Sequence, residues 1–172
     1  MAKPKTPLQL LNDMEQQAAW DKFPDAPREY IVRLPNKASN ANSLTKSIIK
    51  FLQLSGHQAE RISVEGRVID TRQTYTDVLG QTKTTGTFKR IPSSATKGSA
   101  DIGSTIKKTY HKGTPYEVTT GVSVKIEVKW GKDRLSEAQR TYSANVKRAE
   151  GEYWVVHTFD EFYDKYQQFI NG

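Results

Sequence analysis

The sequence predicts an α/β domain with a central mixed β-sheet flanked by helices. Within residues 40–172, helical and strand patterns follow one another in the order helix, three strands, helix, strand, helix. Residues 122–129 alternate strictly between β-branched and polar side chains, which is typical of a half-buried strand. The chain has 172 residues, 35% of them hydrophobic and 10% aromatic, so it is long enough to bury a core.

The first 39 residues form an extension that precedes this domain. Apolar residues repeat at helical spacing over residues 7–20, and Thr6-Pro7 supplies an N-cap followed by a first-turn proline. Residues 23–36 are rich in turn-forming residues, and residues 30–32 are expected to form a short strand among them. The apolar stripe of this helix can dock either on the main domain or on a second subunit, and the sequence does not distinguish the two.

The predicted domain begins with a helix and a strand. Residues 42–55 carry apolar side chains at helical spacing, with Asn42 or Ser43 as the expected N-cap and Gly56 as the stop. The pattern then changes to alternation over residues 58–64, which predicts a strand directly after the helix.

Residues 65–97 form a polar insertion rich in threonine, glycine and lysine. Residues 68–69 and 87–91 are its strand-like patches, and Gly80 is suited to turn a hairpin between them. Two interpretations stay open, namely a flexible basic ribbon that lies along a phosphate backbone and a solvated loop. The ribbon interpretation is favoured by an excess of positive charge. The insertion contains the basic residues Arg67, Arg72, Lys83, Lys89, Arg90 and Lys97, and the acidic residues Asp70 and Asp77 oppose them.

The remaining elements follow in chain order. They are a strand over 100–106, a hairpin turn over 107–121, a strand over 122–129, a helix over 136–149, a short buried strand over 153–156, and a last helix opened by the capping box Thr158-x-x-Glu161.

Asp101, Glu127 and Lys129 are the candidate catalytic residues. Glu127 and Lys129 lie on one face of their strand, with Cα atoms about 7 Å apart, and Asp101 follows three small residues that let a ligand approach closely. Phosphodiester hydrolysis needs a divalent cation, an activated water and positive charge near the developing oxyanion. We therefore expect Asp101 and Glu127 to hold Mg²⁺, with the carbonyl of Val128 as a further ligand. Lys129 would orient or deprotonate the water, or stabilise the transition state.

Each of these residues also has a purely structural explanation. Lys125, Glu127 and Lys129 can form the solvated face of an edge strand. Gln139 lies on the inward stripe of its helix, where a buried amide needs partners, but it also completes a capping box with Ser136. The two roles of Gln139 are compatible if the helix begins beside the site.

Composition narrows the classes of function. The net charge of +7 favours a polyanionic partner, nucleic acid ahead of a membrane surface, and the absence of cysteine excludes disulfides and thiolate chemistry. The chain has no apolar run of membrane-spanning length and no signal-peptide core, so no membrane partner and a cytoplasmic location are expected. An RNA-binding domain is a weaker alternative, because the aromatic residues lie at core spacing.

Three blocks, Gly98-Ser99-Ala100-Asp101, Ile126-Glu127-Val128-Lys129 and Leu135-Ser136-x-x-Gln139, are followed by an aromatic strand. Together they resemble the VRR-NUC group of the PD-(D/E)XK nucleases over about residues 40–170. The resemblance implies a restriction-endonuclease-like core, dependence on Mg²⁺ or Mn²⁺, and DNA as the substrate. By position, Asp101 and Glu127 match the metal ligands, Lys129 the catalytic lysine and Gln139 the motif glutamine.

Small stand-alone members of this group resemble phage-encoded nucleases, some of them dimeric and acting on branched DNA. The resemblance thus implies a structure-selective DNA endonuclease for flaps, nicks or four-way junctions, a phage origin with the host cytoplasm as location, and a homodimer. The DNA-binding candidates are Arg61, Lys89, Arg90, Lys97, Lys107, Lys108 and Lys132.

The chain departs from the group at the first helix of the domain. Members usually carry a glutamate there that contributes to a metal site, whereas residues 40–45 contain no acid. Asn42 is the expected substitute, through its amide oxygen or a bridging water. The alternative function, a non-catalytic DNA-binding module on a nuclease-derived scaffold, rests on this missing acid.

Overall fold

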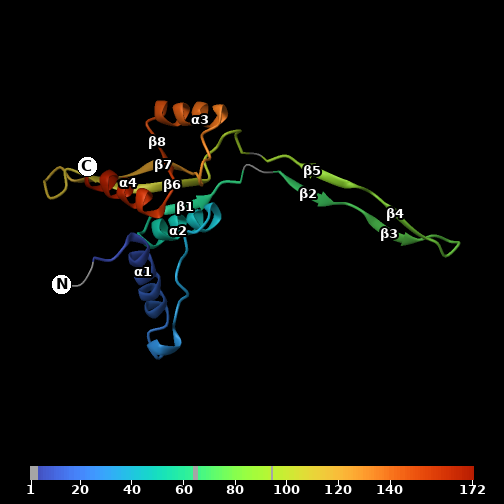
Figure 1. Cartoon of the computed structure of the whole chain (residues 1–172), viewed down its shortest axis with the longest axis horizontal. Coiled ribbons are helices and arrows are strands. Elements are labelled where there is room, and N and C mark those ends of the chain that lie inside the picture. Colours follow the sequence, from blue (N-terminus) through green and yellow to red (C-terminus); the bar gives the residue numbers. More distant parts are fainter. Residues whose placement is uncertain (1–3, 64–65, 94) are drawn as a thin grey trace.

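The computed structural model describes residues 4–63, 66–93 and 95–172, and it is a mixed α/β fold with a projecting ribbon (Figure 1). The central sheet has the order β1-β6-β7-β8, with β6 antiparallel to both β1 and β7, and β8 parallel to β7. The predicted α/β class with a mixed sheet is therefore confirmed. The strands are β1 (Gln58–Arg61), β6 (Ile102–Tyr110), β7 (Val118–Val128) and β8 (Glu152–Val156).

One face of the sheet carries the hydrophobic core. The alternating residues Val124, Ile126 and Val128 of β7 point into it and are buried, as their pattern predicts. Helices α2 (Ala41–Leu54) and α4 (Phe159–Asn171) cover this face. Phe51 of α2 makes edge-to-face contacts with four aromatic rings of α4, with centroids 5.1–6.0 Å apart.

The N-terminal helix α1 (Pro7–Lys22) docks on its own domain. Thr6 and Gln9 form a capping box at its start, and Leu11 is fully buried in the same core as α2 and α4. The expected strand at residues 30–32 is wrong, because Arg28–Tyr30 forms a short 3₁₀ helix (η1) instead. The side chain of Gln16 on α1 accepts a hydrogen bond from the Arg33 amide and donates one to the Ile31 carbonyl, so a helix side chain serves these backbone groups in place of a strand.

Helix α3 (Glu137–Arg148) lies on the opposite face of the sheet and forms the crossover from β7 to β8. None of its residues is fully buried, so it covers this face only loosely. The face beneath it carries the odd-numbered residues of β7, which include Glu127. Helix α3 is therefore the element that turns a solvated sheet face into a partly enclosed site.

Several predicted boundaries need correction. The hairpin turn expected over 107–121 shrinks to 111–117, since Lys107 and Lys108 belong to β6 and the Thr109 and Thr119 hydroxyls pair across the strands at 2.9 Å. The N-cap of α2 is Asn40, which exchanges hydrogen bonds with Ser43. Strand β1 ends at Arg61, and Val64 at the end of the predicted strand lies outside the described residues.

The last helix has half of its expected capping box. The Thr158 hydroxyl accepts from the Glu161 amide, as predicted. The Glu161 carboxylate instead accepts from the amide of His157, one residue before the cap, so the reciprocal bond is shifted by one residue.

The insertion is a long two-stranded ribbon, here residues 66–93. Its base pairs β2 (Arg67–Asp70) with β5 (Phe88–Ile91), and its outer half pairs β3 (Gln73–Thr76) with β4 (Thr82–Thr85). The Thr71 amide donates to the Thr87 carbonyl at 3.1 Å where the two halves join, and a Cβ on the neighbouring Gly86 would lie 2.4 Å from the Thr71 carbonyl oxygen. The insertion is therefore a ribbon rather than an irregular loop, while Glu65 and Ser94 at its ends lie outside the described residues.

Candidate active site

Asp101 and Glu127 lie opposite each other at one end of the sheet. The register pairs Ile102 with Ile126, so the next step outward places Asp101 across from Glu127. The Val128 amide donates to Asp101 Oδ2 at 2.9 Å, and the Ile62 amide donates to the Asp101 carbonyl at 2.8 Å. Backbone groups on both sides therefore hold Asp101 in place.

Gly98 brings the loop before Asp101 against the start of α3. Its φ of +84° is in the left-handed region, and a Cβ at this position would lie 2.4 Å from the Ala138 carbonyl oxygen. Only glycine fits this approach. The small-residue segment predicted to admit a ligand thus packs against the helix that carries Gln139.

Lys129 lies at the centre of the site. Its Nζ is 3.0 Å from Glu127 Oε1, 3.1 Å from Asp133 Oδ2 and 3.1 Å from Gln139 Oε1. Lys129 and Glu127 are only 5% and 3% exposed, so the interpretation of both as a solvated edge-strand face is wrong. The Lys129 amide also donates to the Val156 carbonyl at 2.9 Å, because the pairing with β8 continues beyond Val128.

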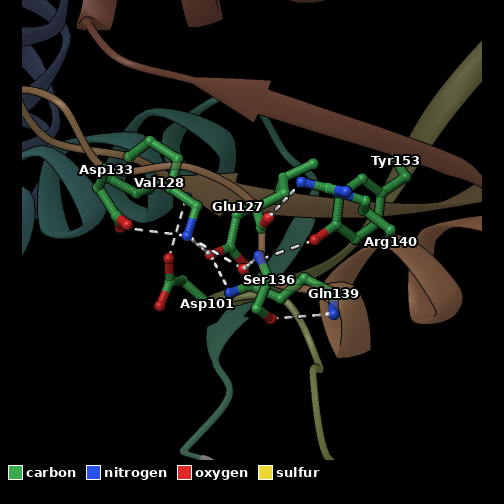
Figure 2. Close-up of polar contacts among 10 residues, drawn as sticks. Asp101, Glu127, Val128, Asp133, Ser136, Gln139, Arg140 and Tyr153 are labelled. Atoms are coloured by element: carbon green, nitrogen blue, oxygen red, sulfur yellow. Dashed lines mark hydrogen bonds and ion pairs between the residues drawn. The ribbon is translucent and has the colours of Figure 1, made fainter.

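Gln139 has both of the roles that its position suggests. Its Oε1 accepts from the Ser136 amide at 3.0 Å, which completes the capping box, and also from Lys129. Its Nε2 donates to Glu127 Oε1 at 2.5 Å. Figure 2 shows Gln139 and Ser136 beside Glu127, with Asp101 close by. Gln139 therefore connects the start of α3 to both Glu127 and Lys129.

The electrostatics follow from this crowding. Burial raises the pKa of Glu127, and the nearby carboxylates of Asp101 and Asp133 raise it further, against the opposing effect of Lys129. Burial by itself lowers the pKa of Lys129, but its contacts with Glu127 and Asp133 outweigh burial, so the net shift is upward. Lys129 is therefore an ammonium group at neutral pH.

Two further side chains belong to the site and were missed by the sequence reasoning. Asp133 pairs with Lys129, and the Tyr153 hydroxyl lies 3.5 Å from Glu127 Oε2. Burial raises the pKa of Tyr153, as does the adjacent Glu127, so the phenol stays protonated and can donate. Strand alternation held a signal for Tyr153, because Trp154 points into the core and its neighbour must point away from it.

The donor set suits a hard divalent cation. Asp101 and Glu127 supply carboxylate oxygens, and their mutual repulsion is the kind of interaction that a bound cation relieves. A group of three or more histidine, cysteine, aspartate or glutamate side chains placed to hold one metal ion is not found within residues 4–63, 66–93 and 95–172. The amide of Val128 binds Asp101, while a ligand role for its carbonyl stays a prediction.

Asn42 lies next to Arg61, whose Nη1 donates to its amide oxygen at 2.6 Å. The oxygen expected to substitute for a metal ligand is therefore engaged by a guanidinium here. Arg61 is followed by Ile62, which binds the Asp101 backbone, so this pair borders the site.

The remaining basic candidates fall into four places. Lys97 adjoins Gly98, and with Arg90 it lines a hollow between the ribbon base and the site. Lys132 is exposed in the turn after β7, and Lys89 is exposed on the ribbon. Lys107 and Lys108 are not brought to the site: they lie about 20 Å along β6 from Asp101 at ~3.3 Å per residue. Lys108 instead stacks over Phe169, 4.7 Å from the ring centre.

No protein-family model, curated protein or solved structure matches this chain. Among the residues that the structure describes, no helix has the length and apolarity needed to cross a bilayer.

Proposed function

We propose that this protein is a metal-dependent DNA endonuclease with a restriction-endonuclease-like core, selective for flaps, nicks or four-way junctions. The observation that carries the proposal is the convergence of Asp101, Glu127 and Lys129 at one end of the sheet, tied together by Gln139. A mixed sheet with helices on both faces is consistent with such a core. The net charge of +7 suits DNA as the partner.

The residues have distinct tasks in this proposal. Asp101 and Glu127 would hold Mg²⁺ or Mn²⁺, and such a cation would supply activation of a water molecule and neutralisation of phosphate charge. Lys129, kept protonated by Glu127 and Asp133, orients the attacking water and stabilises the negative charge that develops on phosphorus-bound oxygen. Gln139 positions Glu127 and Lys129, because its side-chain amide forms a hydrogen bond with each of them.

Cleavage of defined DNA substrates tests this function. Supercoiled plasmid, flaps, nicked duplex and four-way junctions are incubated with Mg²⁺ or Mn²⁺ and wild type, Lys129→Ala or the exposed control Lys112→Ala. Lys129→Ala is expected to lose roughly 100-fold or more in rate, the range seen when one transition-state donor is removed. Asp101→Asn, which keeps an acceptor for the Val128 amide, provides a second inactive variant, and thermal melting confirms that each variant folds. Equal cleavage by all proteins, or none by wild type on any substrate, excludes the proposal.

A non-catalytic DNA-binding module is the second candidate. It is favoured by the absence of an acid at the start of α2, where Asn42 is instead bonded to Arg61. This candidate predicts salt-sensitive DNA binding without affinity for divalent cations. Calorimetric binding of Mg²⁺ or Mn²⁺ that disappears in Asp101→Asn would rule it out.

A further inference from the structure

The ribbon of residues 66–93 has no role in the site described above. Among the residues that the structure describes, each of its four strands pairs only within the ribbon, and Figure 1 shows that it projects away from the sheet and helices. From Arg67 to Leu79 it has a length of about 40 Å at ~3.3 Å per residue. Ile62 precedes the ribbon, and its amide donates to the Asp101 carbonyl. Gly98 follows the ribbon and packs against the start of α3. A ligand held at the ribbon base is therefore next to the candidate active site.

Positive charge is concentrated at the ribbon base. The two aspartates of the ribbon are already engaged, because Asp70 pairs with Arg72 at 2.8 Å and Asp77 pairs with Lys83 at 2.6 Å. Three further basic residues, Arg67, Lys89 and Arg90, are exposed on β2 and β5. In the register of these strands Arg67 and Lys89 share one face and Arg90 lies on the other, so the base is positive on both faces.

The tip of the ribbon presents two apolar side chains to solvent. Val78 is fully exposed and Leu79 is 79% exposed. Asp77 Oδ1 holds the turn by accepting from the amides of Leu79 and Gln81, both at 2.9 Å. An ordered turn that displays two branched apolar residues at the end of a polar, threonine-rich shaft indicates a contact made by the tip itself.

We propose that the ribbon is a DNA-binding arm whose base holds duplex phosphates and whose Val78-Leu79 tip wedges into a base step. This inference rests on the proposed DNA substrate. The charge of the base complements phosphate, and two-stranded β-ribbons bind DNA in the major or the minor groove. Apolar side chains inserted between base pairs unstack them and kink the duplex. A second copy of this chain suits the shaft less well, since the residues of β3 and β4 are exposed and mostly threonine or other polar types.

The wedge has a consequence for substrate choice. Insertion into an intact duplex must disrupt stacking, whereas a nick or a branch point breaks the continuity of the strands and so lowers the cost of opening the stack. Wild type should therefore bind nicked duplex at least roughly tenfold more tightly than intact duplex, and the tip is the element that creates this preference.

Binding without divalent cations tests the tip separately from cleavage. Affinities for intact and nicked duplexes of one sequence are measured in EDTA by fluorescence anisotropy, together with bending by energy transfer between labelled ends. Val78→Ser/Leu79→Ser is expected to bind both duplexes equally and to leave them straight. The matched control is Tyr116→Ser/Val118→Ser, which removes two exposed apolar residues from the other hairpin and should retain the wild-type ratio and bend. A tip variant that behaves as wild type overturns the wedge, as does a wild-type dimer in sedimentation that the tip substitutions dissociate.

The base is tested by the salt dependence of binding. Lys89→Ala/Arg90→Ala should reduce the slope of log K against log salt by about 2, since each phosphate contact contributes roughly 0.9. Lys112→Ala/Lys147→Ala removes the same charge elsewhere and should leave the slope unchanged. An unchanged slope in Lys89→Ala/Arg90→Ala overturns the arm. If cleavage occurs but neither binding nor cleavage depends on the ribbon, the DNA-binding arm is excluded and the endonuclease is not. If binding depends on the ribbon but no cleavage occurs, the endonuclease is excluded and the DNA-binding arm is not.

Discussion

The substitution Gln139→Glu separates the two roles of this residue. In a capping box, glutamate serves as well as glutamine, because either side chain accepts from the N-cap amide. At the site, however, a new carboxylate would replace the Nε2 donor that lies 2.5 Å from Glu127 Oε1. A residue that only caps α3 tolerates the change, whereas a residue placed against Glu127 introduces repulsion between two carboxylates.

The size of the effect follows from proton uptake. Two carboxylates this close relieve their repulsion by binding one proton, so the penalty cannot exceed the cost of protonating a carboxyl group. With an ordinary glutamate pKa of about 4.3, that cost at pH 7 is about 3.7 kcal/mol. Two features reduce this penalty. Lys129 contacts Oε1 of both Glu127 and residue 139, and the pKa of Glu127 is already raised in wild type. We expect a loss of about 1–3 kcal/mol, or roughly 3–10 °C in melting temperature for a chain of this size.

Urea unfolding between pH 5 and 8 without divalent cations measures this loss. The variant binds a proton on folding that wild type does not, so its deficit should shrink as the pH falls toward the ordinary carboxyl range. Ser136→Ala is the control, since it removes only the cap and should cost about 1 kcal/mol at every pH. If Gln139→Glu is as stable as wild type at pH 7, or its deficit does not change with pH, Gln139 does not contact Glu127 and does not belong to the site.

Two further predictions concern Gly98, beside the site, and His57, at the far end of β6. Gly98→Ala should lose roughly 2–3 kcal/mol of unfolding free energy, because its Cβ would lie 2.4 Å from the Ala138 carbonyl oxygen at a φ of +84°. Gly113 has a φ of +76°, and an added Cβ would have no described atom beyond its chain neighbours within 4 Å, so Gly113→Ala should lose only about 1 kcal/mol. Equal losses would contradict the close approach of Gly98 to α3. Burial and the adjacent Lys107 lower the pKa of His57 in the folded chain, so stability present above pH ~6.5 is lost as the pH falls below it. His57→Gln should flatten this decline in urea titrations while His111→Gln preserves it, and a decline of the same slope in His57→Gln would refute the assignment.

Local patterns in the sequence were sufficient for the fold class. The alternation in β7 and the helical stripes of α2 and α4 each depend on residues close in the chain, and burying them against one another leaves little choice of layers. Cap residues such as Thr6 and Ser136 were also predictable, because a cap bonds a backbone amide only a few residues away. The strand expected at residues 30–32 failed because Gln16, distant in sequence, satisfies that backbone.

The sequence by itself determined which residue types were available to the site and, through period-2 alternation, that Glu127 and Lys129 share a face. Tertiary structure alone decided that α3 encloses this face, that Asp133 and Tyr153 join the site, and that Lys107 and Lys108 stay at its far end. The physical reason is that alternation fixes a side chain's direction from neighbouring atoms, whereas its burial and partners depend on which distant segments pack above it. The same holds for the ribbon. Its paired residues lie up to 24 residues apart in the sequence, and tertiary structure alone shows that residues on both of its faces are exposed.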